Sequence, residues 1–357
     1  MTPQKKEDQE IKVHSEYDYE LNESQKVGST VGRGLSVMLV TKMLQLNDQA
    51  IDELHKIDQW DFDIFKLRKT TQNNELVTIL PYILSKRGLL GVTALDFNKL
   101  MNFIRVIQNG YKKITYHNKT HGADLCQTFN YFMTTGEVRD TIKLDNIECI
   151  SSYIAACCHD YEHPGVNNVF LVNIHDMIAV RHNDLSVLES HHIAASFELM
   201  HRDPENNWAV KYKPAEYKRI RKVMITTVLA TDMSKHFPDL GLLKSRMSSD
   251  EFDPESEKDK EKLHNLMFHL ADISNPTKNW GLCRKWTDLL YFEFFAQGDL
   301  EKQNNFPVSQ FMDRQTTNIA KASGGFIDII IKPAYMTAIE VFPKLEFIEQ
   351  LLEENKA

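Results

Sequence analysis

Cysteine is scarce in this chain of 357 residues, which contains five cysteines, an odd number, and no C-x-x-C pair. They are Cys126, Cys149, Cys157, Cys158 and Cys283. This usage disfavours a disulfide framework and a cysteine-ligated structural zinc site, and it favours free thiols in a reducing compartment. We therefore expect a cytoplasmic protein.

Long apolar runs and an excess of positive charge are also missing. No apolar run reaches the roughly 18 residues that a membrane-spanning helix needs, and the first ten residues, MTPQKKEDQE, lack the apolar stretch of a secretory signal. The chain has 42 Lys and Arg against 50 Asp and Glu, a net charge of −8. That balance argues against nucleic acid or an anionic membrane as the main partner. A phosphate-handling site would then need local positive charge, which a bound metal ion could supply.

The motifs of several common chemistries are absent too. The sequence contains no G-x-S-x-G nucleophile elbow, no Walker loop and no G-x-G-x-x-G dinucleotide fingerprint. Serine hydrolases, P-loop enzymes and dinucleotide-dependent enzymes would each need one of these motifs.

Helical spacing of apolar residues dominates the chain from Gln59 onward, as in residues 96–113. Strand signals are scarce, and we predict a helix even for the β-branched segment FIDIIIKP at 326–333. The sequence therefore predicts an all-α fold with one compact domain at 50–350. A polar arm and a leading helix occupy 1–49, with no sustained apolar period over 1–24, and a C-terminal tail occupies 351–357.

Histidine is concentrated in one part of the chain, where nine of the 14 fall between residues 117 and 201. His117 and His121 are four positions apart, so they share a face if this segment is a helix. His159 and His163 repeat the spacing. Asp160 directly follows His159, so the two converge on one centre only near a helix end or bend.

Any one of these histidines, taken singly, is more often a satisfied core residue than a metal ligand. Several imidazoles together with a His-Asp pair are harder to explain as packing, because burying them without partners would cost several kcal/mol. His and Asp ligands without cysteine suit Zn²⁺, with Mg²⁺ or Mn²⁺ at a second site held mainly by carboxylate and water. Two ions roughly 3.5–4 Å apart can share a hydroxide and clamp a phosphoryl group. The pattern thus favours a two-metal phosphohydrolase.

The histidines belong to longer motifs, of which the first is His159-Asp160-x-x-His163-x-Gly165-x-x-Asn168. The others are Tyr116-His117-Asn118-x-x-His121, Ser186-Val-Leu-Glu189-x-His191-His192, Thr231-Asp-Met-Ser-Lys-His236, Ala271-Asp272-Ile-Ser-Asn-Pro276, Glu293-Phe-Phe-x-Gln297-Gly298-Asp299 and Gly325-Phe326-Ile-Asp328. In their order along the chain, these motifs resemble those of the cyclic nucleotide phosphodiesterases. The resemblance covers about residues 50–350, and it implies the all-α, multi-helix catalytic domain of an HD-type metal phosphohydrolase.

The resemblance implies a role for each matching position. His121, His159, Asp160 and Asp272 match the family's zinc ligands, and Asp160 would bridge to the second ion. His117 matches the general acid that protonates the leaving O3′ of the ribose. The positions that hold waters and orient the ligands are matched by His163, Glu189, His192 and Thr231. The substrate-pocket positions are matched by Tyr116, Met233, Ile273, Asn275, Thr287, Leu290, Phe311 and Phe326, and Leu290 and Phe326 would sandwich the purine.

Two positions bear on which purine is bound. Asn275 occupies the place where cAMP-preferring members commonly carry Asn beside the adenine edge, and its amide can both donate and accept. Nearly all members place a glutamine three residues before the Phe of G-F-I-D, where its amide binds the purine edge. That position is Ser323 here, whose hydroxyl is shorter and offers one donor.

We therefore expect a hydrolase that opens the 3′ ester of cAMP to give 5′-AMP. A metal-bridging hydroxide would attack phosphorus, and His117 would protonate the departing oxygen. Use of both cAMP and cGMP is the alternative within the enzyme class. A cyclic-nucleotide-binding protein with impaired turnover is the alternative outside it, favoured only by Ser323. The expected partner is a small-molecule cyclic nucleotide, and a homodimer is left open.

Overall fold

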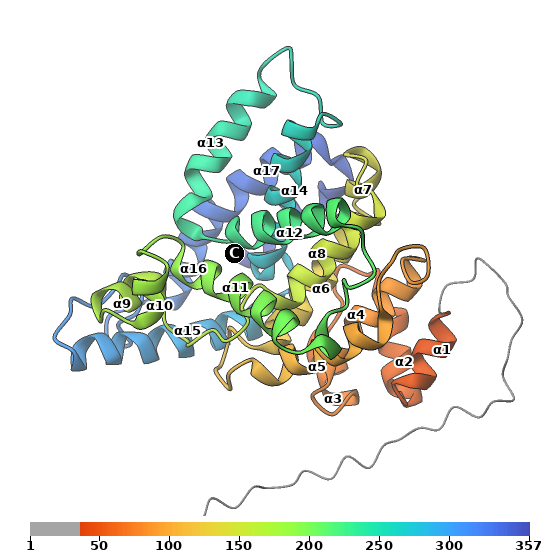
Figure 1. The fold of residues 1–357 in the computed structure, drawn as a ribbon. Helices are drawn as coiled ribbons and strands as arrows, with labels where there is room; N and C mark the ends of the chain where they lie inside the picture. The colour runs from red at the N-terminus through yellow and green to blue at the C-terminus, as the bar shows by residue number, and fades with distance from the viewer. Residues whose placement is uncertain (1–35) are drawn as a thin grey trace, which may run out of the picture. The chain divides into compact units, whose positions relative to one another are not determined.

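A computed structural model describes residues 36–357, and helices make up all the regular secondary structure of that part of the chain (Figure 1). The first nine helices are α1 (Val37–Met43), α2 (Asp48–His55), α3 (Ile64–Thr70), α4 (Glu75–Lys86), α5 (Phe97–Gly110), α6 (Lys119–Met133), α7 (Val138–Thr141), α8 (Asn146–Cys158) and α9 (Asn168–Asn173). The other nine are α10 (Met177–Arg181), α11 (Val187–Arg202), α12 (Pro214–Leu229), α13 (His236–Met247), α14 (Glu257–Asp272), α15 (Trp280–Gln303), α16 (Ile319–Phe326), α17 (Lys332–Val341) and α18 (Phe347–Lys356). The arm predicted over residues 1–24 lies outside the described residues.

Short polar side chains fix where many of these helices begin. The side chain of Asn118 accepts a hydrogen bond from the backbone N–H of Thr120, so α6 begins at Lys119. Asp145 and Glu148 form a reciprocal capping box at the start of α8. The starts of these two largely buried helices are therefore set by local sequence.

The core is centred on α6 and α8. Every residue of α6 from Thr120 to Met133 is buried, and α6 is contacted by α4, α8 and α14. The other side of α8 packs against α12 (Figure 1). Because α6 and α8 are buried nearly all round, the side chains at their ends lie inside the protein. The start of α6 and the end of α8 carry histidine motifs.

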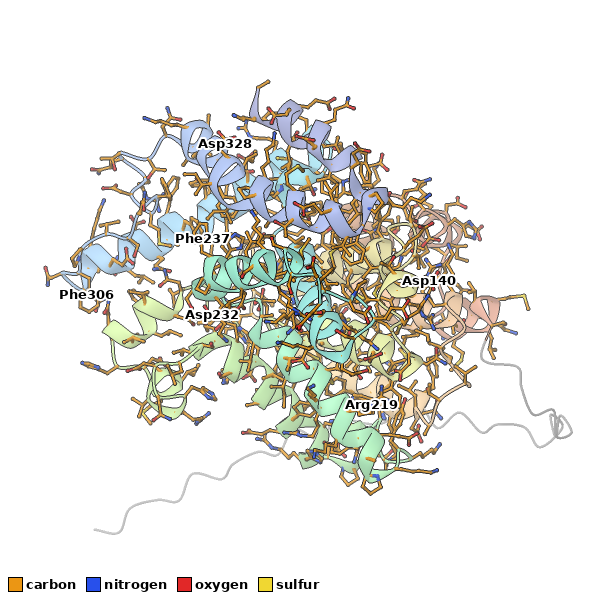
Figure 2. The ribbon with its side chains drawn as sticks, turned by 90° about the horizontal axis from the view of Figure 1, so that it is seen from above. Asp140, Arg219, Asp232, Phe237, Phe306 and Asp328 are labelled. Carbon is orange, nitrogen blue, oxygen red and sulfur yellow. The ribbon has the colours of Figure 1, made fainter. Side chains whose placement is uncertain are left out.

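A second, smaller apolar cluster is built by α9, α10 and the start of α11. Its buried members are Val166, Phe170, Leu171, Ala179, Val187 and Leu188. Phe306, from the segment after α15, packs edge-on against Phe170 with ring centroids 6.4 Å apart (Phe306 is labelled in Figure 2). This cluster holds the segment between the His-Asp pair and α11 against the C-terminal part of the chain.

Two predictions about the C-terminal region have clear outcomes. The β-branched segment after Phe326 is helical as predicted, in the form of a π-helical stretch at Ile327–Ile331 between α16 and α17. The tail predicted from residue 351 differs from the structure, since α18 continues to Lys356 and its Leu352 is fully buried. Among residues 36–357, no helix is both long and apolar enough to cross a membrane.

Candidate metal and general-acid site

Three helix ends bring the predicted zinc ligands together. His121 lies in the first turn of α6, His159 directly follows the last residue of α8, and Asp272 is the last residue of α14. Asp160 is the next residue after His159. The C-terminal ends of α8 and α14 carry the negative end of the helix dipole, which favours a cation between them.

The ligand atoms of these four residues lie within a few ångströms of one another. His121 Nε2 is 2.9 Å from Asp272 Oδ1 and 3.5 Å from Asp160 Oδ2. His159 Nε2 is 3.1 Å from Asp160 Oδ2 and 3.2 Å from Asp272 Oδ1. The structure therefore gathers the whole predicted ligand set, from three helices, around one point.

The hydrogen bonding of His159 bears on the charge at this point, where its Nε2 faces the carboxylates of Asp160 and Asp272. Its Nδ1–H donates to the carbonyl of Ala156 at 2.9 Å, so in a neutral ring Nε2 would present a lone pair to two carboxylates. His159 Nε2 and Asp160 Oδ2 are both buried and make no hydrogen bond. Burial would lower the pKa of His159, but the charges of Asp160 and Asp272 outweigh it and raise that pKa well above its usual range. A cation between these atoms would resolve the conflict, so the residues fit a metal ion.

A second group of possible ligands adjoins the first. Asp160, His163 and His192 bring ligand atoms within 4.8 Å of one another, and His192 Nε2 is 3.7 Å from Asp160 Oδ1. His192 Nδ1–H donates to the carbonyl of Tyr161 at 2.6 Å, so its buried Nε2 also presents a lone pair. Burial lowers the pKa of His192 to about 3, which keeps the ring neutral. Two acceptors facing each other fit a water or a cation between them.

Helix α11 anchors the turn that carries Asp160 and His163. Besides the bond from His192, His191 Nε2 lies 2.9 Å from a carboxylate oxygen of Glu162, whose backbone has φ 65°. A non-glycine residue at positive φ is strained and needs such anchoring. The adjacent His191 and His192 thus fix the path of the turn as well as facing the site.

Glu189 and Thr231, the other two residues predicted to hold waters and orient the ligands, lie in the first turn of α11 and just after α12. Glu189 is in the first turn of α11, where its carboxylate accepts from Asn168 Nδ2 at 3.0 Å. Burial, with a smaller contribution from the charge of Asp232, raises the pKa of Glu189 to about 7. Thr231 is buried just after α12, and its hydroxyl donates to the carbonyl of Val228.

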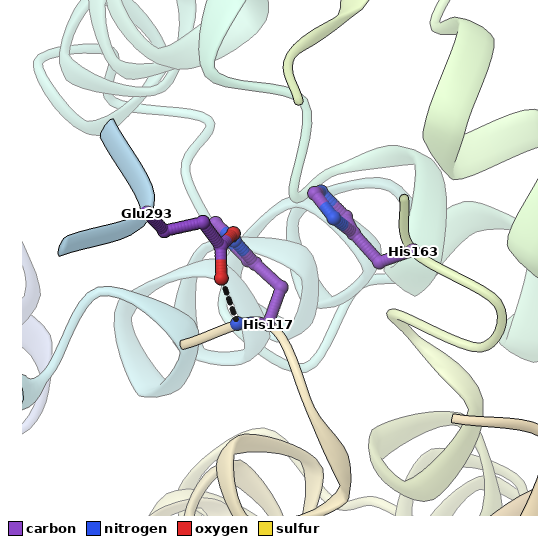
Figure 3. A group of neighbouring side chains, drawn as sticks. All are labelled: His117, His163 and Glu293. Carbon is purple, nitrogen blue, oxygen red and sulfur yellow. Dashed lines mark hydrogen bonds and ion pairs between the residues drawn. The ribbon is translucent and has the colours of Figure 1, made fainter. Parts of the chain in front are cut away.

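The predicted general acid His117 is held by Glu293 of α15. His117 Nδ1 lies 2.5 Å from Glu293 Oε1. Glu293 Oε2 accepts the backbone N–H groups of Tyr116 and His117, and the second of these bonds is the dashed line in Figure 3. The imidazole stacks on that of His163, with centroids 4.1 Å apart and planes 14° apart. Burial lowers the pKa of His117, but the charge and hydrogen bond of Glu293 outweigh it and raise that pKa to about 9.

Asn275 and Tyr116, predicted to line the pocket, form a fixed pair. The Tyr116 hydroxyl donates to Asn275 Oδ1 at 2.5 Å, and Asn275 Nδ2 donates to Asp124 Oδ2 at 3.1 Å. All three side chains are buried. Because an ionised carboxylate only accepts, Asp124 orients the amide of Asn275 with its oxygen towards Tyr116.

The remaining predicted pocket residues come from five parts of the chain. On α15, Thr287 and Leu290 are partly buried, and on α16, Ser323 and Phe326 are partly buried. The others are Met233 after α12, Ile273 after α14 and Phe311 after α15. Met233 is 42% exposed and Phe311 45% exposed, so neither belongs to the core. The assignment of these seven to a substrate pocket stays a prediction.

The shared helical face considered for His117 and His121 is not found, whereas the helix end expected near His159 and Asp160 is confirmed. Asn118 caps α6, so His117 precedes the helix that carries His121. Likewise α8 ends at Cys158, so the chain between His159 and His163 is a turn. The residues meet because helix ends converge, not because one helix presents two histidines on one face.

Two residues of the site were missed by reasoning from the sequence. Glu293 was noted only as part of a motif, although its position before Phe-Phe in an otherwise apolar stretch marks a buried carboxylate that needs a partner. Asp124 follows His121 by three positions on the buried face of α6, which gives the same signal. Their partners, His117 and Asn275, are more than 150 residues distant, as the separations of 176 and 151 positions show.

Comparison with known proteins agrees with this geometry. The family model described as 3′5′-cyclic nucleotide phosphodiesterase matches residues 116–352. The chain is 37% identical over 305 residues to "Dual specificity calcium/calmodulin-dependent 3′,5′-cyclic nucleotide phosphodiesterase 1B" of Homo sapiens, an alignment that covers 85% of this chain and 55% of that protein. It is 34% identical over 308 residues to the corresponding 1C protein of Mus musculus, covering 86% of this chain and 42% of that protein. The chain thus spans about half the length of these curated relatives.

A solved structure shares the fold. "Structure of LmjPDEB1 in complex with IBMX" superposes with a TM-score of 0.78 and covers 87% of this chain and 96% of that chain, at 24% identity. At this identity the likeness shows the fold alone. It confirms the predicted all-α catalytic-domain architecture.

Proposed function

This chain belongs to the 3′,5′-cyclic nucleotide phosphodiesterase family, and on that premise we propose that it hydrolyses the 3′ ester of cyclic purine nucleotides to give nucleoside 5′-monophosphates. The observation that carries the proposal is the pairing of two arrangements within the matched region. One is the cluster of His121, His159, Asp160 and Asp272. The other is His117, protonated and held by Glu293 beside it.

The residues of the cluster would hold two metal ions. His121, His159, Asp160 and Asp272 would bind Zn²⁺, because imidazole and carboxylate ligands without thiolate suit that ion. Asp160 would also reach a second, harder ion, Mg²⁺ or Mn²⁺, whose remaining ligands would be waters oriented by His163, Glu189, His192 and Thr231. When bound, the ions would supply charge stabilisation at the phosphoryl group and would activate the attacking water.

The protein's own contribution to bond breaking is proton delivery. Water adds to phosphorus, the bond between phosphorus and O3′ breaks, and His117 gives the proton on Nε2 to the departing oxygen. Glu293 holds Nδ1, so only Nε2 is free to face the substrate. With a pKa of about 9, His117 carries that proton at neutral pH. His163 lies stacked beneath it and stays neutral, since burial lowers its pKa.

We propose that both cAMP and cGMP are substrates, in place of the cAMP preference expected from Asn275. Two observations support this. Both relatives quoted above are named as dual-specificity enzymes, and the amide of Asn275 is already engaged by Tyr116 and Asp124. Because Tyr116 and Asp124 each occupy one hydrogen-bonding group of that amide, less of it is available to a base edge, and Asn275 gives a weaker reason to expect adenine preference.

A direct assay tests the proposal. The purified chain, supplied with Zn²⁺ and Mg²⁺, is incubated separately with cAMP and cGMP, and the products are resolved by ion-exchange chromatography. We expect 5′-AMP and 5′-GMP, with no 3′-monophosphate. Binding of both nucleotides without any product would instead support the binding-protein alternative. Neither binding nor turnover would overturn the assignment. A cytoplasmic location and a homodimer remain predictions from the sequence.

A further inference from the structure

Helix α15 presents a row of buried polar side chains along one face. Glu293, Gln297 and Glu301 follow one another at intervals of four, so they lie on the same face of the helix. Their exposed fractions are 6%, 2% and 3%, and polar groups buried to this extent need hydrogen-bond partners. The proton transfer proposed above uses Glu293, which holds His117, but neither of the other two residues.

The hydrogen bonds of Gln297 fix the direction of its amide. Its Oε1 accepts the backbone N–H of Asn167 at 2.8 Å, and its Nε2 donates to Glu301 Oε1 at 2.8 Å. Glu301 also accepts the backbone N–H of Ser309 at 2.7 Å and the hydroxyl of Ser309 at 2.6 Å. A carboxylate that accepts three hydrogen bonds has no donor to offer, so Glu301 turns Nε2 of Gln297 towards itself and Oε1 towards Asn167.

The backbone that Gln297 holds leads directly to His163. The N–H of Gly165 donates to His163 Nδ1 at 3.0 Å, and Gly165 has a φ of 82°, a conformation that glycine adopts without strain. The short segment from His163 to Asn167 is therefore attached to the imidazole ring at one end and to Gln297 at the other. Because Nδ1 accepts this bond, the neutral ring of His163 carries its proton on Nε2.

The position of the His163 ring matters because it stacks on the ring of His117, with centroids 4.1 Å apart and planes 14° apart (Figure 3). Glu293 holds the His117 ring directly. Gln297 holds the His163 ring through the segment that ends at Asn167. Both anchors lie on α15, one helical turn apart, so a single rigid element sets how the two rings lie against each other.

We propose that Gln297 is a positioning residue for proton transfer, because by holding Asn167 it keeps His163 stacked on His117 and so keeps Nε2 of His117 directed at the leaving oxygen. The inference rests on the proposed function and adds a residue that touches neither substrate nor ligand. Glu301 contributes by fixing the direction of the Gln297 amide. Without these bonds, the turn that carries His163 would be free to move relative to α15 and to the proton donor.

Gln297→Met tests the proposal, because it keeps the length of the side chain and removes both hydrogen bonds. Misplacing a catalytic group by about 1 Å can cost about 10²-fold, so we expect kcat of the metal-loaded enzyme to fall by about 10-fold to 10²-fold. KM and zinc content should change little, since the bonds of Gln297 go to Asn167 and Glu301. The matched control is Gln350→Met, which breaks an exposed pair of the same spacing, Gln350 with Glu354, on α18.

Exchanging the amide and the carboxylate separates positioning from packing. Gln297→Glu alone places two carboxylates face to face, and Glu301→Gln alone turns one N–H donor towards another. In the double variant, the carboxylate at position 297 accepts from Asn167 and from the amide at position 301, whose oxygen accepts the N–H of Ser309. We expect kcat of the double variant to exceed that of both single variants. These three variants keep the side chains at nearly the same size, so they decide the matter if Gln297→Met does not fold.

Hydrogen exchange measures the anchoring without turnover. The backbone amides of Gly165 and Asn167 should lose protection in Gln297→Met and keep it in the control. An unchanged kcat in Gln297→Met, or a double variant no faster than the single ones, would overturn the inference even though the wild-type enzyme is active. A wild-type protein that protects both amides but hydrolyses neither nucleotide would overturn the proposed function instead.

Discussion

At the scale of single residues, the histidines of this site differ in the group that holds Nδ1 of each imidazole ring. His159 and His192 donate Nδ1–H to backbone carbonyls, so each directs the lone pair of Nε2 towards Asp160. In His117 the same nitrogen, Nδ1, is held by the carboxylate of Glu293, whose charge outweighs burial and raises the pKa of the ring to about 9, so that Nε2 carries a proton as well. Two backbone carbonyls and one carboxylate thus distinguish the two histidines proposed to face the metal ions from the one proposed to donate a proton.

The role of His117 can be tested by substitution. Asn is smaller, neutral and unable to donate a proton from the same position. We expect His117→Asn to lower kcat by about 10²–10⁴-fold, the usual contribution of a general acid. Zinc content, measured by elemental analysis, should stay equal to that of the wild type. Loss of zinc in this variant would mean that His117 is a ligand.

The pH dependence of the reaction should report the contact with Glu293. In the proposed mechanism turnover requires protonated His117, whose pKa Glu293 raises to about 9, so activity should fall as pH rises through that value. Removing the negative charge in Glu293→Gln lowers the pKa of His117, and the alkaline limb of the kcat profile should move to lower pH. Glu216→Gln, which alters a surface cap of α12, is the control. If the alkaline limb of Glu293→Gln does not move, Glu293 does not raise the pKa of His117.

At the scale of helices and loops, the local sequence predicted which segments are helical. It did not predict which distant side chains meet, because that depends on how the helices pack. The periodicity of residues 96–113 predicts a helix, and α5 runs from Phe97 to Gly110. The cap at Asn118 was not recognised, which is why His117 was placed on a helix with His121. No periodicity could pair His117 with Glu293, or Asn275 with Asp124, because such contacts depend on how distant segments pack.

The substitution Gly298→Ala tests how closely α15 packs against the loop that carries Phe311. A Cβ there would overlap the carbonyl of Met312, and Phe311 beside it has a φ of 68°, which disfavours any relaxation through that residue. We expect Gly298→Ala to destabilise the fold by about 1–3 kcal/mol, as overpacking does. KM should rise as well if Phe311 lines the pocket.

The matched control for this substitution lies on the same helix. A Cβ at Gly281 would meet only Asn279 Oδ1 at 3.4 Å, an ordinary contact. Gly281→Ala should therefore leave the free energy of unfolding unchanged or raise it by up to about 1 kcal/mol. Equal urea-denaturation midpoints for the two alanine variants would contradict the account of Gly298.

At the scale of the whole molecule, stability in acid should depend on one buried ion pair. Asp259 is fully buried in α14, and the two nitrogens of Arg246 lie 2.8 and 3.0 Å from its carboxylate oxygens. The hydrogen bonds from Arg246 lower the pKa of Asp259 to about 2. Because the folded-state pKa is depressed, the pair contributes its full stability above the unfolded-state value and loses it as pH falls through about 2.

Arg246→Met isolates this contribution. The free energy of unfolding is measured by urea denaturation at pH 6 and at pH 2.5 for both proteins. The wild type should lose more stability between these pH values than the variant, since contributions from the other carboxylates are common to both. An equal loss in the two proteins would show that the pair does not stabilise the fold.

The central claim for the whole molecule is that four residues from three helix ends bind the ions on which cyclic-nucleotide hydrolysis depends. The most direct measurement determines bound metal and turnover on the same sample, before chelation, after chelation and during re-addition of Zn²⁺ and Mg²⁺. The account predicts that turnover disappears with the metal and returns as about two ions per chain are bound, and that Asp160→Ala recovers neither. A metal-free protein that still hydrolyses cyclic nucleotides at the full rate would contradict it.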